Sequence, residues 1–134
     1  MIWIRGTFWL SALYDVLIGL AFIVLGDSLF ERFEVTPPNH PGYYEFPALL
    51  LLIFGVLFAR IAMDPLGNRS LMLYGVALKA SYCGVILYHH VTDGVPGLWI
   101  PFAYIDLGFL VLFLAAYVAS GTMGREKHGE GAWS

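Results

Sequence analysis

Three ionisable residues stand inside long apolar runs of the chain: Asp15, Lys79 and Asp106. In a bilayer, a charge at the centre of such a run costs roughly 2.5–3.5 kcal/mol unless another group pairs with it. At a rise of about 1.5 Å per helical residue, Asp15 lies about 12 Å, Lys79 about 14 Å and Asp106 about 20 Å from the same side of the membrane. We therefore predict that the two acids and the base meet in one cluster.

This cluster could do several kinds of chemistry. Two carboxyl groups and an ammonium could exchange protons with a hydrophobic substrate, form a polar pocket or a proton relay, or only fix the register of the helices as an ion pair. One of the charges could instead face a partner subunit. The formal charge of the cluster is -1, so either one carboxyl is protonated or a bound cation or ligand donor completes the set.

The residues around the charges suggest a pocket. Thr7, Ser11, Asp15 and Gly19 recur every four residues and would form one polar and small stripe on a helix. Tyrosines on the neighbouring runs can supply further hydroxyl groups. The predicted pocket consists of Ser11, Tyr14, Asp15, Lys79, Tyr82, Tyr104 and Asp106.

A second group of residues has the chemistry of metal ligands. His89 and His90 end one apolar run, and His40 and Glu45 lie in the long segment between the first two runs. Imidazole and carboxylate suit zinc, copper or iron. Adjacent histidines point about 100° apart on a helix, however, so the pattern favours hydrogen bonding at a membrane surface over a metal site.

The elements that would position these residues are four apolar helices. The 134-residue chain is 59% hydrophobic and 13% charged, which is about half the usual charge of a soluble domain, and its mean hydropathy is +0.73. We predict an all-α membrane bundle of four helices with antiparallel neighbours, formed as one domain by residues 1–120. The predicted spans are 7–26, 46–63, 70–91 and 98–120, joined by an external loop at 27–45 and followed by a polar, disordered tail at 121–134.

Ala48, Gly55 and Ala59 would pack the second helix outside the polar centre, because that helix carries no central charge. Gly26 and Gly121 are expected to end the first and fourth helices. Pro47 is expected to open the second helix, and Asn68 or Ser70 to cap the third.

The distribution of charge predicts the orientation. Arg32 is alone on one side, whereas the other side collects Arg5, Arg60, Arg69, Arg125 and Lys127. The positive-inside rule therefore places both termini in the cytoplasm, and we expect the cytoplasmic membrane of a bacterium. The net charge of -3 and the absence of a Lys/Arg run argue against a nucleic-acid partner. The single cysteine, Cys83, excludes an intrachain disulfide.

The layout of the chain resembles the DoxX-like group of small bacterial four-helix membrane proteins. The resemblance rests on Arg5-Gly6 before the first span, on Asp15 and Gly19 within it, on the long first loop, and on the second-span segment 49–55 (LLLLIFG). Some members of that group are subunits of quinone-linked oxidoreductases. The resemblance thus implies an accessory or quinone-associated role, and it transfers no catalytic residue.

Three functions compete on this evidence. The first is an accessory component that binds a lipid-like or quinone-like molecule and associates with other membrane subunits or with copies of itself. The second is a small membrane enzyme that uses Asp15, Lys79 and Asp106 as acid and base groups. The third is an oligomeric channel or transporter, which would need a continuous polar path rather than one polar level.

Overall fold

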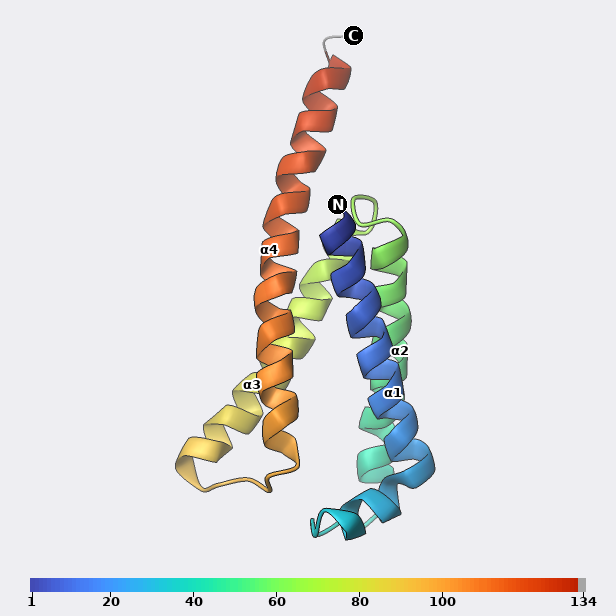
Figure 1. The fold of residues 1–134 in the computed structure, drawn as a ribbon, viewed down its shortest axis with the longest axis vertical. Coiled ribbons are helices and arrows are strands. Elements are labelled where there is room, and N and C mark those ends of the chain that lie inside the picture. Colours follow the sequence, from blue (N-terminus) through green and yellow to red (C-terminus); the bar gives the residue numbers. More distant parts are fainter. Residues whose placement is uncertain (133–134) are drawn as a thin grey trace.

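The computed structural model describes residues 1–132, and helices are its only regular elements there (Figure 1). Each of the four long helices contains a stretch long and apolar enough to cross a membrane. The predicted all-α class with four such helices is therefore confirmed. The elements are α1 (Ile2–Arg32), α2 (Gly42–Met63), the short 3₁₀ helix η1 (Arg69–Leu71), α3 (Met72–Thr92) and α4 (Trp99–Ala132).

The helices form two antiparallel pairs. α1 packs mainly on α2, and α3 packs mainly on α4. In Figure 1 the N- and C-terminal ends point to the same end of the molecule, and the two pairs spread apart toward the opposite end. We call these the terminal end and the far end.

Small residues bring α1 and α2 into close contact. A Cβ atom added at Gly19 would lie 2.7 Å from the carbonyl oxygen of Ala48, and one added at Gly55 would overlap the Val16 side chain. Ala48 and Gly55 are both buried, while Ala59 packs at the margin of the core. The predicted contact face of the second helix is therefore confirmed, since backbones approach this closely only where Cβ atoms are small or absent.

Aromatic rings fill the terminal half of the core. Phe8 stacks on Phe113 with ring centroids 4.5 Å apart, and Phe58 lies 5.1 Å from Phe113. Gly75 makes room for two of these rings, because a Cβ there would lie 2.7 Å from Phe58 and 3.1 Å from Phe113. The expectation that the second helix stays outside the centre was wrong, since the long side chain of Phe58 reaches across.

The first helix is longer than predicted. α1 continues past Gly26 to Arg32 and changes direction at Leu25, whose backbone (φ -121°, ψ 17°) is not helical. Gly26 does not end the helix. Instead it leaves space for the Tyr44 ring, which a Cβ atom would overlap. Residues 27–32, predicted as part of the external loop, are thus the continuation of α1 beyond a kink.

The second and third helices begin differently from the prediction. α2 starts at Gly42, so Pro47 lies inside the helix rather than at its first position. The Asn68 side chain does not cap the third helix, because it donates a 2.8 Å hydrogen bond to the Arg60 carbonyl at the end of α2. It thereby satisfies a terminal carbonyl of one helix instead of a terminal N–H of the next.

The fourth helix also continues beyond its predicted end at Ser120. The Arg69 guanidinium donates to the Tyr117 carbonyl at 2.8 and 3.0 Å and lies where a Cβ of Gly121 would be, 2.5 Å from Nη2. Gly121 therefore serves close packing within the helix. The expected disordered tail at 121–134 differs from the structure, which carries α4 to Ala132; residues 133–134 lie outside the described residues.

Replacing Gly19 with alanine should destabilise the fold by about 1–3 kcal/mol, because the backbone of α2 must move away. Gly108→Ala is the matched control, since a Cβ at that α4 position meets nothing within 4 Å. Thermal unfolding in detergent should show a lower Tm for Gly19→Ala only. Equal Tm values for the two variants would contradict this account of the α1–α2 contact.

Candidate functional site

The three buried charges meet at the centre of the molecule. The Lys79 ammonium donates to Oδ1 of Asp15 at 2.9 Å and to Oδ1 of Asp106 at 3.1 Å. Asp15 and Lys79 are each 1% exposed, and Asp106 is 7% exposed. α1, α3 and α4 contribute one residue each, so the predicted cluster is confirmed.

Aromatic rings surround the ammonium group. The Lys79 Nζ atom lies 5.2 Å from the ring centroid of Tyr14, 5.1 Å from that of Phe109 and 5.5 Å from that of Phe58. A cation within about 6 Å of an aromatic face is attracted to it. These rings also keep the surroundings of the ion pairs apolar, where attraction between opposite charges is stronger than in water.

Not all polar atoms of this centre are satisfied. Within the described residues, the second carboxylate oxygen of Asp15, the Tyr14 hydroxyl and the Ser11 hydroxyl are buried without a hydrogen-bond partner. Leaving such an atom unpaired costs about 1–3 kcal/mol, more if it is charged. All three residues belong to α1 and lie within little more than one helical turn.

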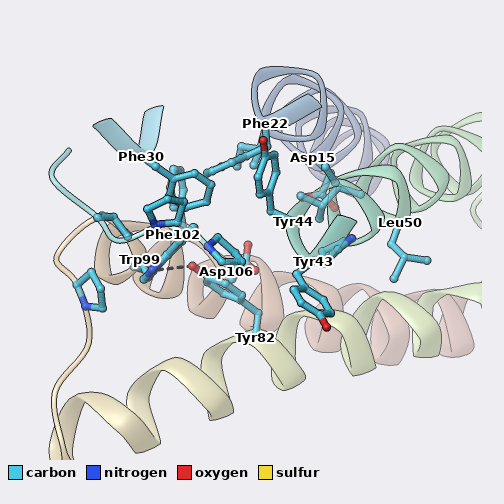
Figure 2. Close-up of a pocket in the computed structure, with 18 of the residues that line it drawn as sticks. Asp15, Phe22, Phe30, Tyr43, Tyr44, Leu50, Tyr82, Trp99, Phe102 and Asp106 are labelled. Carbon is cyan, nitrogen blue, oxygen red and sulfur yellow. Dashed lines mark hydrogen bonds between the residues drawn. The ribbon is translucent and has the colours of Figure 1, made fainter. Parts of the chain in front are cut away.

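A cavity of 580 Å³ leads from the cluster toward the far end of the molecule (Figure 2). This volume lies in the range of pockets that enclose small-molecule ligands. Its walls are mostly apolar, and all four helices contribute to them. They include Tyr14, Asp15, Ile18 and Phe22 of α1, Pro47 and Leu51 of α2, Leu78 and Tyr82 of α3, and Trp99, Phe102 and Asp106 of α4.

The far part of the cavity is built by aromatic residues and by the segment after α1. Phe22 stacks on Trp99 with centroids 5.7 Å apart, and Phe30 lies edge-on to Tyr44 at 5.1 Å. The bend at Leu25 redirects the last turns of α1, which carry Phe30. Val35 to Pro38 complete the wall. Residues 27–45 were predicted only as an external loop, and no sequence pattern indicated that they help to form the cavity wall.

The opposite side of the charge cluster is filled with side chains. Phe8, Phe58 and Phe113 are fully buried there and belong to the main core rather than to the cavity wall. The cavity thus reaches the charges from the far end and stops at them. The site is a pocket with one polar end, and within the described residues it is not a passage through the bundle.

The structure sorts the predicted pocket residues into three groups. Tyr14, Asp15, Tyr82 and Asp106 line the cavity. Ser11 and Lys79 are buried beside it without forming its wall. The prediction for Tyr104 was wrong, because its side chain is 57% exposed. It precedes Asp106 by two residues, about 200° around the helix, and therefore points away from the centre.

Unlike the Tyr14 hydroxyl, the Tyr82 hydroxyl has a hydrogen-bond partner among the described residues. It donates a 3.0 Å hydrogen bond to the backbone carbonyl of Trp99, drawn as a dashed line in Figure 2. Cys83, one residue further along α3, donates to the Ala103 carbonyl at 3.2 Å. These two bonds join α3 to the first turns of α4, so Tyr82 holds the wall in place.

The four candidate metal ligands do not form a metal-binding group among the described residues. In the part of the chain that the structure describes, no three His, Cys, Asp or Glu side chains are grouped to hold a metal ion. His40 Nδ1 accepts a hydrogen bond from the Gly42 N–H, and His89 pairs with Asp93 at 3.0 Å. Hydrogen bonds from His89 and Thr92 lower the pKa of the Asp93 carboxyl. Glu45 and His90 are exposed.

Comparison of the chain with protein-family models, with curated proteins and with solved structures gives no significant match.

Replacing Lys79 with methionine should destabilise the protein by about 3–5 kcal/mol, because two buried carboxyl groups lose their counter-charge. The triple variant Asp15→Asn, Lys79→Met, Asp106→Asn removes all three charges and should recover much of this loss. Thermal unfolding in detergent at neutral pH measures both effects. An unchanged Tm for Lys79→Met would show that the cluster does not hold the helices together.

Proposed function

We propose that this protein is a small integral membrane component that binds a lipid-like or quinone-like molecule between its two helix pairs. The observation that carries the proposal is the 580 Å³ cavity, which is apolar along most of its length and ends on the buried Asp15 and Asp106 carboxyl groups. Such a pocket suits a molecule with a long apolar body and one polar end. Convergent polar groups at the end of an apolar pocket are typical of ligand sites.

The proposed setting is the cytoplasmic membrane of a bacterium, with both termini in the cytoplasm. Four helices of sufficient length and hydropathy support membrane insertion. The positive residues Arg5, Arg60 and Arg69 lie near the terminal end, which supports the orientation. In this setting the cavity opens toward the outer surface and the adjoining half of the bilayer.

The proposed role is that of an accessory subunit in a larger membrane system, such as an oxidoreductase, or of a homo-oligomer. The resemblance to DoxX-like proteins supports it. The structure adds that the helix surfaces carry large exposed apolar side chains, among them Leu13, Leu17, Ile53 and Val111. These surfaces can face lipid tails or neighbouring membrane subunits.

A small membrane enzyme is the second candidate. The observation that favours it is that Tyr14 and Asp15 contribute buried, unpartnered polar atoms at the end of a pocket that could hold a hydrophobic substrate. Such groups can exchange protons with a bound molecule. A channel is less well supported, because the packed Phe8, Phe58 and Phe113 rings lie beyond the charges.

A brominated alkane tests whether the cavity binds apolar molecules. Bromine quenches tryptophan only at close range, so we expect 1-bromododecane to quench Trp99, which lines the cavity, in a variant whose other three tryptophans are phenylalanine. Quenching should saturate with added probe. The matched reporter keeps only Trp9, which is 49% exposed on the outer surface of α1, and should show weak, unsaturable quenching.

Two leucine substitutions on α3 serve as controls for the quenching experiment. Leu78→Phe narrows the cavity and should weaken saturable quenching, whereas Leu73→Phe alters a side chain that is 47% exposed and should not. Equal, unsaturable quenching of Trp99 and Trp9 would contradict the proposed binding function.

Cysteine labelling tests the proposed orientation. In a Cys83→Ala background, Ser28→Cys should react with a membrane-impermeant maleimide in intact spheroplasts, because this exposed residue lies at the far end of α1. Ser70→Cys is also exposed but lies at the terminal end, so it should react only after lysis. The reverse pattern would show the opposite orientation, and labelling of both in intact spheroplasts would contradict a four-span arrangement.

A further inference from the structure

The polar end of the cavity presents an acceptor that has no donor. Lys79 donates to Oδ1 of Asp15, whereas Oδ2 of the same carboxylate is buried and has no partner within the described residues. Asp15 is 1% exposed and forms part of the cavity wall. A carboxylate oxygen can only accept hydrogen bonds. Whatever occupies this end of the cavity must therefore donate one to be well bound.

The neighbouring residue adds a second requirement. Tyr14 also lines this end of the cavity, and its hydroxyl is buried without a hydrogen-bond partner among the described residues. A phenolic hydroxyl can both donate and accept. A ligand group that donates to Asp15 and accepts from Tyr14 would satisfy both residues at once.

We infer that the cavity selects molecules with a hydroxyl group at one end of an apolar body, that is, long-chain or isoprenoid alcohols and phenols. The inference rests on the proposed binding function and names its ligand class. The ligand O–H donates to Oδ2 of Asp15, and the ligand oxygen accepts the Tyr14 hydroxyl proton. The apolar body then lies along Ile18, Leu78 and Phe102 toward the far end of the cavity.

Other polar ends satisfy the site less well. An ether, an ester or an oxidised quinone offers acceptor oxygens only, so it can bond to Tyr14 but faces the Asp15 oxygen without a proton between them. An ammonium group can donate to Asp15, but it would do so on the same carboxylate that already holds the Lys79 ammonium. An ammonium must also give up its water shell to enter this apolar cavity, which costs several kcal/mol and offsets its attraction to the net charge of -1 on the cluster.

Competition among three ligands with one apolar body tests the selection. Farnesol, farnesyl methyl ether and farnesylamine are each added to the protein that keeps only Trp99 in the presence of 1-bromododecane, and recovery of fluorescence reports displacement of the bromoalkane. We expect farnesol to act at a concentration about tenfold lower than the ether, as one additional hydrogen bond to a charged group predicts. The amine should be weaker than the alcohol.

The possible outcomes separate this inference from the proposed function. If the ether equals or surpasses the alcohol, Asp15 acts as a protonated donor and the inference fails. If the amine binds best, the cluster is a cation site and the inference also fails. If bromododecane quenches but none of the three ligands displaces it, hydroxyl selection is wrong while apolar binding stands. Absence of saturable bromododecane quenching would refute the proposed function itself.

Two tyrosine variants test the geometry of the hydroxyl site. Tyr14→Phe removes a hydroxyl that has no partner among the described residues, so Tm should not fall, but the preference for farnesol over the ether should fall several-fold. Tyr104→Phe changes an exposed tyrosine and should preserve the preference. Asp15→Asn replaces an acceptor-only group with one that can also donate, and should reduce or reverse the preference. An unchanged preference in both Tyr14→Phe and Asp15→Asn would overturn the inference.

Discussion

One buried ammonium group determines how this small bundle is arranged. A charged lysine in apolar surroundings needs partners of opposite charge, and Lys79 finds them in Asp15 and Asp106 on two other helices. Both ion pairs are short, which fixes the height and rotation of α1, α3 and α4 relative to one another. Because α1 packs closely on α2, the position of α1 also determines that of α2. The two helix pairs are therefore joined chiefly through the charge cluster and the aromatic rings packed beside it.

The close packing of α1 on α2 is a separate constraint that supports the centre. Gly19 is one turn beyond Asp15, and its missing Cβ lets the backbone of α2 lie against α1 at Ala48. Gly55, about two turns after Ala48 on α2, likewise leaves space for the Val16 side chain of α1. A rigid α1–α2 pair presents the Asp15 carboxyl at one fixed position. If α1 and α2 could move relative to each other, forming the 2.9 Å contact between Asp15 and Lys79 would cost the conformational entropy of ordering both helices, which would offset the stabilisation from the ion pair.

The sequence predicted the features that depend on hydropathy and on buried charge. The four helices follow from apolar length, and the cluster follows from the cost of three charges at similar depth. Helix ends were less predictable, because Gly26 and Gly121 look like termination signals but are used to accommodate Tyr44 and Arg69. Those uses depend on contacts with residues far away in the chain. The reach of Phe58 into the core was missed for the same reason.

The cavity shows most clearly what sequence patterns leave undetermined. Its polar end was predicted through Tyr14, Asp15, Tyr82 and Asp106, since they share inward helix faces. Its far wall was not, because a bend at Leu25 brings Phe30 and Val35 over the space between the helix pairs. No periodicity signals such a bend.

The same bend has a consequence for how a ligand would reach the charges. Phe8, Phe58 and Phe113 fill the terminal half of the core. The cavity therefore extends from the charges toward the far end only. The residues that close over that end come from the segment after the bend and from Trp99, and Phe30 and Val35 of that segment form a second buried cluster with Phe22 and Ala48. Two short ion pairs at the charged centre and apolar, largely aromatic walls toward the far end are what a site needs to hold one polar group firmly beside a long apolar body.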